Sequence, residues 1–156
     1  VPEVDTFVAM TEAWGAKPTP LNFGELYLAL SQGAVDGQEN PLPTIQAGKF
    51  NEVQKYLVLT GHIITPRLVV INEGFWKSLG TQDQKIVKDA LDEGIAWQNA
   101  EIQKAEASLV ATFKAAGMTV VEPDLAAFRK ATLDAVPPKF TKIWGEGTWD
   151  KIQAVK

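Results

Sequence analysis

Short extended segments alternate with helical patterns along the first half of the sequence. The predicted extended segments are residues 1–4, 18–21, 35–36, 53–64 and 67–71, and the predicted helices between them are residues 6–14, 23–32 and 43–50. Val, Ile, Leu, Tyr and Thr dominate the last two extended segments, a composition typical of β-strands. Because strands and helices alternate, the pattern predicts an α/β fold with a mostly parallel sheet covered by helices.

The second half of the sequence is mainly helical and contains one unusually long helical pattern. No proline occurs between Thr81 and Gly117. Apolar residues recur through this interval at helical steps: Ile86, Ala90, Ile95, Ile102, Ala105, Leu109 and Phe113. One helix of this length would extend roughly 50 Å at 1.5 Å per residue. That is longer than an ordinary domain requires, so the pattern predicts a helix that bridges two lobes.

The ends of the predicted elements carry local signals. Glu25 stands three residues after Asn22, which is the spacing of a capping box, and Gly33 is expected to end the helix that follows. Residues 118–121 predict a strand, and Pro137-Pro138 is expected to interrupt the next helix, because proline removes a backbone donor. The candidate N-cap residues are Asp5, Asn22, Asn72 and Asp124.

Composition narrows the possible functions. The chain has 156 residues, 46% of them hydrophobic and 22% charged, with a net charge of −4, which suits a globular domain with a real core. Lys and Arg form no block, which argues against a nucleic-acid partner. The absence of cysteine removes disulfides, thiol catalysis and cysteine-based zinc sites. No phosphate-binding loop is present, and neither a metal nor a cofactor is expected.

The polar segment between residues 33 and 42 is the strongest functional signal. Gln38, Glu39 and Asn40 lie between a predicted short strand and a helix that Pro41 can begin, and Gly37 permits backbone angles closed to other residues. In open α/β sheets, ligands bind where strands lead into helices. An amide such as that of Asn40 carries donors and an acceptor, which suits a carboxylate or hydroxyl ligand.

Some of these residues have a purely structural interpretation as well. Glu25 and Glu39 have the chemistry of a glycosidase pair, although the spacing of Glu25 favours a helix cap. His62, the only histidine, is more often hydrogen-bonded in a structural role than a lone metal ligand. Phe23 can wall a pocket at the start of a helix or pack in the core, and for Tyr27 core packing is favoured. A small hydrolase with Glu39 as general acid or base is the alternative to a binding protein.

Several motifs follow one another along the first half of the sequence. They are Pro18-Thr19-Pro20, Val35-Asp36-Gly37-Gln38-Glu39-Asn40-Pro41, Glu52-Val53-Gln54-Lys55 and Thr60-Gly61-His62. The sequence resembles the solute-binding proteins of TRAP transporters, the DctP family, from Val1 at least to the long helix. The resemblance implies a periplasmic protein, not an enzyme, whose two α/β lobes close on a small organic acid, such as a sugar acid or a C4-dicarboxylate. The acid then passes to a membrane permease driven by a sodium gradient.

The resemblance also implies roles for particular residues. Asn40 matches the asparagine that hydrogen-bonds the ligand carboxylate, and Phe23 matches the aromatic residue that packs against the ligand. Glu39 and His62 match positions near the pocket that act through water. The family's main ligand-binding residue is an arginine just before a Val-Pro-like segment, whereas this chain starts at Val1-Pro2. The sequence is therefore expected to be a processed or truncated product that corresponds to the C-terminal half of a binding protein and is deficient in binding by itself.

The same resemblance implies how the chain is divided. Residues 1–66 and 105–156 are expected to form the second lobe, and residues 67–104 to cross toward the missing first lobe. Apolar residues of the crossing segment should then be exposed. A domain-swapped second copy or the missing N-terminal lobe is expected to cover them. The apolar residues in question are Val69, Val70, Ile71, Phe75 and Trp76.

Overall fold

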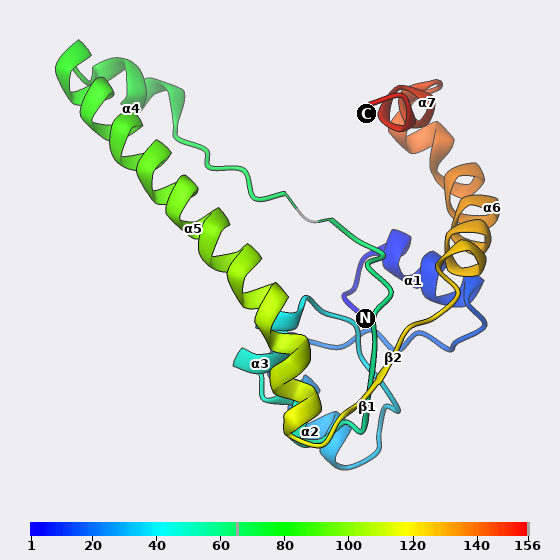
Figure 1. The fold of residues 1–156 in the computed structure, drawn as a ribbon. Helices are drawn as coiled ribbons and strands as arrows, with labels where there is room; N and C mark the ends of the chain where they lie inside the picture. The colour runs from blue at the N-terminus through cyan, green and yellow to red at the C-terminus, as the bar shows by residue number, and fades with distance from the viewer. Residues whose placement is uncertain (65, 156) are drawn as a thin grey trace.

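The computed structural model describes residues 1–64 and 66–155, and helices dominate it (Figure 1). The long helix α5 and the helix pair α6–α7 diverge from a region that contains a small sheet. The elements in chain order are α1 (Asp5–Ala13), α2 (Phe23–Ser31), α3 (Leu42–Ala47), the 3₁₀-helix η1 (Phe50–Glu52), β1 (Tyr56–Val58), α4 (Glu73–Ser78), α5 (Thr81–Ala115), β2 (Thr119–Val121), α6 (Leu125–Trp144) and α7 (Thr148–Gln153).

The sheet has two parallel strands, β1 and β2, in which Leu57 lies opposite Val120. Parallel neighbours need a long crossover, and the segment that contains α4 and α5 supplies it. The expected α/β class, the parallel sheet and the long helix are therefore confirmed. The sheet is smaller than predicted: among the described residues, 1–4, 35–36 and 67–71 form no strand, and of 53–64 only Tyr56–Val58 is one.

The end of α2 explains why residues 35–36 form no strand. Gly33 has φ +70 and donates to the carbonyl of Leu30, and the backbone N–H of Ala34 donates to the carbonyl of Ala29. This is a Schellman cap, as expected for a glycine just past a helix. The N–H of Val35 also points to the Ala29 carbonyl. Because the helix end uses these donors, they are not available to a sheet.

The predicted N-caps have mixed outcomes. Asn72 accepts a hydrogen bond from the backbone N–H of Phe75 at 3.0 Å, and Asp124 caps α6 in the same way. The prediction for Asp5 was wrong, because Val4 is the N-cap and Asp5 is the first residue of α1. Asn22 is an N-cap, but its side chain makes no capping bond. The capping box with Glu25 is therefore not formed.

The sequence predicted that Pro137 and Pro138 interrupt this helix. In the structure, they do not interrupt α6. The helix continues through both prolines to Trp144. Val136 and Phe140 on either side of them are buried against Ala9 and Met10 of α1. Burial of these side chains offsets the two backbone hydrogen bonds that the prolines forgo. Tertiary packing thus overrides the local helix-breaking tendency.

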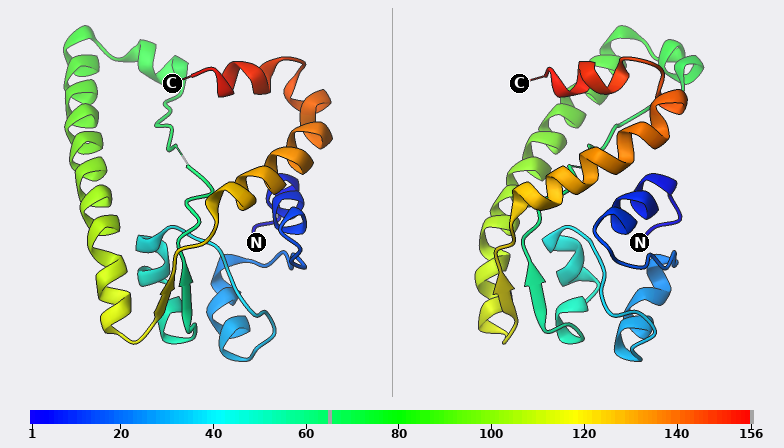
Figure 2. Two further views of the ribbon diagram at one scale, coloured as in Figure 1. Left: turned by 45° about the vertical axis from the view of Figure 1, so that its right-hand side comes forward. Right: turned by 90° about the vertical axis from the view of Figure 1, so that its right-hand side faces the viewer.

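The main hydrophobic core lies around β1. Side chains from α2, α3, η1, the C-terminal part of α5 and the start of the β2 segment meet there, and Phe50 and Phe113 are each 1% exposed. Figure 2 shows α5 passing the sheet and continuing far beyond it. Within α5 only Leu109 and Phe113, near its C-terminal end, are buried. The core therefore anchors one end of the long helix. The buried members are Leu26, Leu30, Ile45, Phe50, Leu57, Leu109, Phe113 and Met118.

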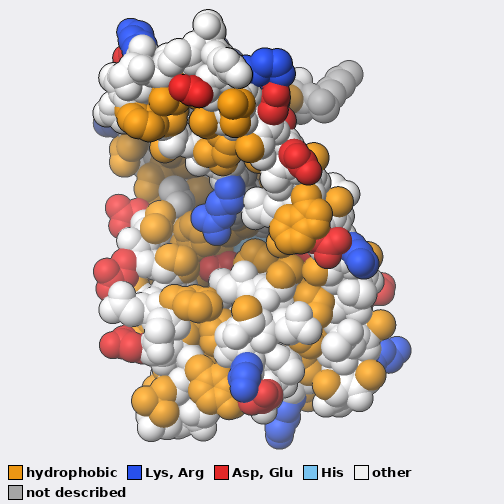
Figure 3. All heavy atoms as spheres, turned by 90° about the vertical axis from the view of Figure 1, so that its left-hand side faces the viewer, with side chains coloured by type: hydrophobic (Ala, Val, Ile, Leu, Met, Phe, Trp, Pro, Cys, Tyr) orange, Lys and Arg blue, Asp and Glu red, His pale blue; other side chains and the backbone are white. Residues whose placement is uncertain are grey.

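Residues 67–104 carry many apolar side chains that face solvent. Val69, Val70, Ile71 and Phe75 are exposed, as the sequence predicted, whereas Trp76 is half-buried. Leu91, Ile95 and Ile102 extend the exposed apolar series along α5. Figure 3 looks onto the side of the molecule on which α5 lies, and hydrophobic side chains gather at several places on it. Thr65 and Lys156, which fall in the predicted lobe, lie outside the described residues.

Candidate functional site

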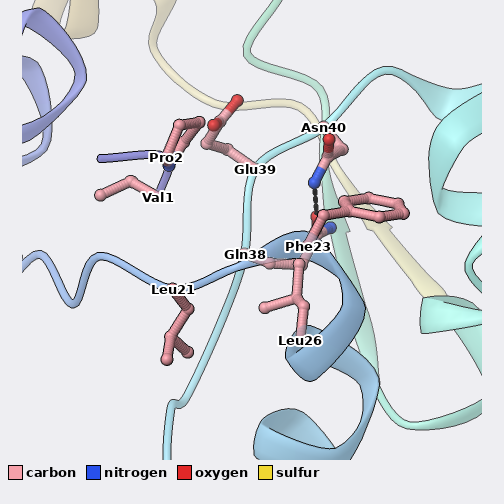
Figure 4. A pocket seen from close by; sticks show the side chains of 8 residues that line it. All are labelled: Val1, Pro2, Leu21, Phe23, Leu26, Gln38, Glu39 and Asn40. Atoms are coloured by element: carbon pink, nitrogen blue, oxygen red, sulfur yellow. Dashed lines mark hydrogen bonds between the residues drawn. The ribbon is translucent and has the colours of Figure 1, made fainter. Parts of the chain in front are cut away.

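A hollow of about 110 Å³ gathers most of the residues that the sequence singled out. Phe23 of α2 and the segment Gln38–Asn40 face it, and Val1 and Pro2 come to it from the start of the chain (Figure 4). Its volume is well below the roughly 300–1,000 Å³ of a typical ligand pocket. The hollow is therefore too small to be a whole ligand pocket and has the size of a part of one. The lining residues are Val1, Pro2, Leu21, Phe23, Leu26, Gln38, Glu39 and Asn40.

Backbone contacts bring the first residues of the chain to the hollow. The carbonyl of Val1 accepts a hydrogen bond from the N–H of Leu21 at 3.2 Å, and the amino group of Val1 donates to the carbonyl of Thr19 at 3.3 Å. These bonds hold Val1 and Pro2 beside the entrance to α2. The sequence did not identify these two residues, or Leu21 and Leu26, as lining residues, because only tertiary contacts place them there.

The segment that carries the polar side chains runs from the cap of α2 to α3. Pro41 is the N-cap of α3, so residues 38–40 lie in the short connection between the two helices. Gly37 does not use the left-handed backbone region, which Gly33 does use. The left-handed backbone angles that glycine permits are therefore used at Gly33 and not at Gly37.

The two amides of this segment form a direct contact. Nδ2 of Asn40 donates to Oε1 of Gln38 at 2.7 Å (Figure 4). Both side chains line the hollow and are half-buried. The side chain of Asn40 does not cap the following helix, since Pro41 holds that position. Asn40 is therefore not explained by the common capping role of asparagine.

Glu39 points to a second polar group, the single histidine. Oε2 of Glu39 lies 3.3 Å from Nε2 of His62, and Nδ1 of His62 lies 2.6 Å from the hydroxyl oxygen of Thr60. The side chains of Glu39 and His62 are each 17% exposed. The His62 ring also meets Trp14 edge to face, with centroids 5.1 Å apart. In a neutral imidazole, Nε2–H would donate to the carboxylate while Nδ1 accepts from Thr60.

Phe23 is placed by the core beneath it. Its ring meets the buried ring of Phe50 at a centroid distance of 5.6 Å, and 56% of Phe23 remains exposed. One face of the ring is thus free to contact a ligand. Tyr27, one turn further along α2, is exposed and donates to Glu52 at 3.3 Å. The expectation that Tyr27 packs in the core was therefore wrong.

The environment of Tyr27 has an electrostatic consequence. Desolvation and the hydrogen bond to the Glu52 carboxylate, with its charge, raise the pKa of the Tyr27 hydroxyl above its ordinary value. A phenolate beside a carboxylate is disfavoured by like-charge repulsion. Tyr27 lies outside the set of residues that line the hollow.

The structure brings together Phe23, Glu39 and Asn40 around one hollow and places His62 behind Glu39. Glu25 does not line the hollow, so the structure does not pair it there with Glu39. Gln38 is a further lining residue that the sequence placed in the segment without giving it a role. The hollow offers amide donors, an acidic group and an exposed aromatic face, which suits a polar ligand with a flat or ring-shaped apolar side.

Two features of other functional classes are absent from the part of the chain that the structure describes. Over residues 1–64 and 66–155, three or more metal-ligating side chains do not come together anywhere. Over the same residues, no helix combines the length and hydrophobicity that a membrane crossing requires.

The sequence and fold match proteins of one family. The profile of the bacterial extracellular solute-binding proteins, family 7 (DctP), covers residues 1–142. The sialic acid-binding periplasmic protein SiaP of Vibrio cholerae is 44% identical over 141 residues, which are 90% of this chain and 44% of that protein. These matches confirm the resemblance and the periplasmic location expected from the sequence.

Two solved structures share the fold. A TRAP periplasmic solute-binding protein from Roseobacter denitrificans, with bound 3-deoxy-D-manno-oct-2-ulosonic acid, has a TM-score of 0.89 and 37% identity, over 99% of this chain and 51% of that one. A second, from a Sulfitobacter species with bound β-D-galacturonate, has a TM-score of 0.83 and 32% identity, over 92% and 47%. The chain thus spans about half the length of its relatives. By sequence and by fold, it belongs to family 7 of the bacterial extracellular solute-binding proteins, the DctP family.

Proposed function

We propose that this chain forms one lobe, the C-terminal one, of a TRAP-transporter solute-binding protein, and that its hollow is one wall of a cleft that captures a small organic acid. The membrane permease of the transporter would then receive the acid. The observation that carries the proposal is the grouping of Phe23, Glu39 and Asn40 around one hollow. Asn40 would donate to the ligand carboxylate, and the exposed face of Phe23 would pack against the carbon skeleton.

A sugar acid is the preferred ligand class, ahead of a C4-dicarboxylate. An exposed aromatic ring suits the apolar face of a sugar ring, and the two amides can bind hydroxyl groups as well as a carboxylate. The relatives described above are named for, or contain, sialic acid, an octulosonic acid and galacturonate. All three ligands are sugars with a carboxylate.

The alternative, a small hydrolase that uses Glu39 as general acid or base, has less support. Proteins of this family are solute-binding proteins, and the Glu39 carboxylate is engaged by His62. We infer that the chain binds its ligand without converting it. Turnover of a sugar-acid ester or glycoside that disappears in Glu39→Gln would contradict this inference.

The ligand class can be tested with a thermal-shift screen of organic acids on the complete two-lobed protein. A ligand that binds only the folded state stabilises it by roughly 2.7 kcal/mol at a hundredfold excess over its dissociation constant. We expect shifts with sugar acids such as D-galacturonate and smaller or no shifts with the matching neutral sugar, D-galactose. Shifts with neutral sugars alone would contradict the carboxylate proposal.

Asn40→Ala tests the proposed contact to the carboxylate. Loss of a hydrogen bond to a charged group should weaken binding in the complete protein by about 1.5–3 kcal/mol, measured by calorimetry. Gln46→Ala is a matched control, because it removes an exposed amide from α3 that does not line the hollow. An unchanged affinity together with a lower melting temperature would give Asn40 a structural role only.

The exposed apolar residues of 67–104 lead to a further part of the proposal. The relatives contain a second half that this chain does not span. In the complete protein, the corresponding half would cover these apolar residues. A second copy that exchanges this segment is the other way to cover them. Residues 1–66 and 105–156 would then form the lobe that carries the hollow, and α5 would bridge the two lobes.

Light scattering with intact-mass analysis separates the alternatives for the isolated chain. We expect a dimer, a larger assembly or a complex with the remaining part of the protein, and weak ligand binding, because half a cleft cannot bury most of a ligand. A stable, dilute monomer of 17.0 kDa that binds an organic acid with a dissociation constant on the order of 1 μM would contradict both expectations.

A further inference from the structure

We propose that Gln38 is a positioning residue of this site, which holds the Asn40 amide in the orientation that a ligand needs. The inference rests on the proposed function, because it assigns Gln38 a role that acts through Asn40. The carrying observation is the hydrogen bond from Nδ2 of Asn40 to Oε1 of Gln38, 2.7 Å long.

Gln38 and Asn40 are two residues apart, and their side chains lie on the same side of the connection between α2 and α3. Figure 4 shows this arrangement: Gln38 and Asn40 lie together, and the Glu39 carboxylate is turned away from them. Glu39 instead contacts His62. The segment therefore presents an amide pair and an acid–imidazole pair on different sides.

An asparagine without such a partner can present either its carbonyl oxygen or its N–H₂ group to a ligand. The last torsion of the side chain is broad and roughly two-fold, so a half-turn exchanges the carbonyl oxygen with the N–H₂ group. A carboxylate ligand needs the N–H₂ group and is repelled by the oxygen. The carbonyl of Gln38 accepts one N–H of Asn40, which leaves the other N–H and the Asn40 carbonyl in defined places. Fixing a side chain before binding lowers the entropy lost on binding.

The loss of the hydrogen bond between Asn40 and Gln38 sets the size of the effect on ligand binding. Without the Gln38 acceptor, the Asn40 amide spends a large part of its time in the orientation that does not suit the ligand. Ligand binding must then also fix the orientation of this amide. We expect Gln38→Met, which keeps the side-chain length but removes the acceptor, to weaken ligand binding about three- to tenfold, the range of one neutral hydrogen bond. Gln38→Glu keeps an acceptor for the Asn40 N–H and should preserve the orientation of the amide.

The first test needs no ligand and uses the side-chain amide signals of Asn40 in a ¹⁵N–¹H NMR spectrum. We expect Gln38→Met to shift these signals and to increase the ps–ns motion of the Asn40 amide group in ¹⁵N relaxation. Gln38→Glu should keep the Asn40 amide ordered, and the control Gln46→Met should leave the signals unchanged. Asn40 signals that are the same in Gln38→Met as in the original protein would overturn the proposal.

The second test is a double-mutant cycle for binding of D-galacturonate to the complete protein. If Gln38 acts through Asn40, Gln38→Met should cost three- to tenfold alone but nothing in the Asn40→Ala background. Additive losses would mean that Gln38 contacts the ligand by itself, and would overturn the positioning role. If neither D-galacturonate nor any other acid of the screen binds the original protein, the proposed function is contradicted. The NMR test would still decide whether Gln38 holds Asn40.

Discussion

Gly48 offers a sharp test of how the core supports the hollow. A Cβ added at Gly48 would lie 2.5 Å from Cζ of Phe50 and 2.8 Å from each Cε atom. Phe50 is 1% exposed and meets the ring of Phe23, which lines the hollow. Its ring therefore has no open space to move into, because protein cores are close-packed. Gly48→Ala must displace a core ring or shift the end of α3.

The expected cost can be worked out from two opposing effects. Overpacking a core by one methyl group costs about 1–3 kcal/mol. The backbone of Gly48 is in the right-handed helical region, with φ −81. Alanine at such a position therefore gains about 0.4–1 kcal/mol by restricting the unfolded chain. The net loss is roughly 0–2.6 kcal/mol, or a fall in melting temperature of up to roughly 10 °C for a domain of this size.

Gly37→Ala is the matched control for Gly48→Ala. A Cβ at Gly37 would meet nothing within 4 Å, and its backbone is not in the left-handed region. We therefore expect this change to be neutral or to stabilise the protein by about 0.4–1 kcal/mol. Urea denaturation followed by circular dichroism measures both variants. If Gly48→Ala is as stable as Gly37→Ala, the Phe50 ring is not held as the structure shows, and the argument that it supports Phe23 fails.

Two further predictions concern a helix cap and a tyrosine. Asp124→Ala should lower the free energy of unfolding by about 1 kcal/mol, because Asp124 accepts two backbone N–H groups. Asn22→Ala, at an N-cap without a side-chain bond, should change it by less than about 0.5 kcal/mol. Equal effects in thermal unfolding would refute the assignment. The raised pKa of Tyr27 means that its stabilising contribution is present below the ordinary tyrosine pKa and is lost as pH rises through the raised value. In a Tyr56→Phe background, ultraviolet absorbance should show Tyr27 ionising at a lower pH once Glu52→Gln removes the acceptor charge, and an unchanged midpoint would contradict this cause.

Local signals in the sequence determined most of the helices. Gly33 ends α2 in a left-handed conformation and Asp124 caps α6, because each acts on backbone groups within a few residues. The proline-free interval after Thr81 is one helix to Ala115. These features depend on interactions between near neighbours in the chain, which the sequence contains directly.

Tertiary structure decided what depends on distant partners. Residues with β-forming side chains at 67–71 form no strand, because no neighbouring strand pairs with them among the described residues. Pro137 lies inside a helix because packing against α1 outweighs the lost hydrogen bonds. The contact between Glu39 and His62 joins residues 23 positions apart, and Val1 reaches the hollow only through its bonds to the segment before α2. A sequence pattern records which side chains are available, but the free energy of a long-range contact depends on what the whole fold brings beside each of them.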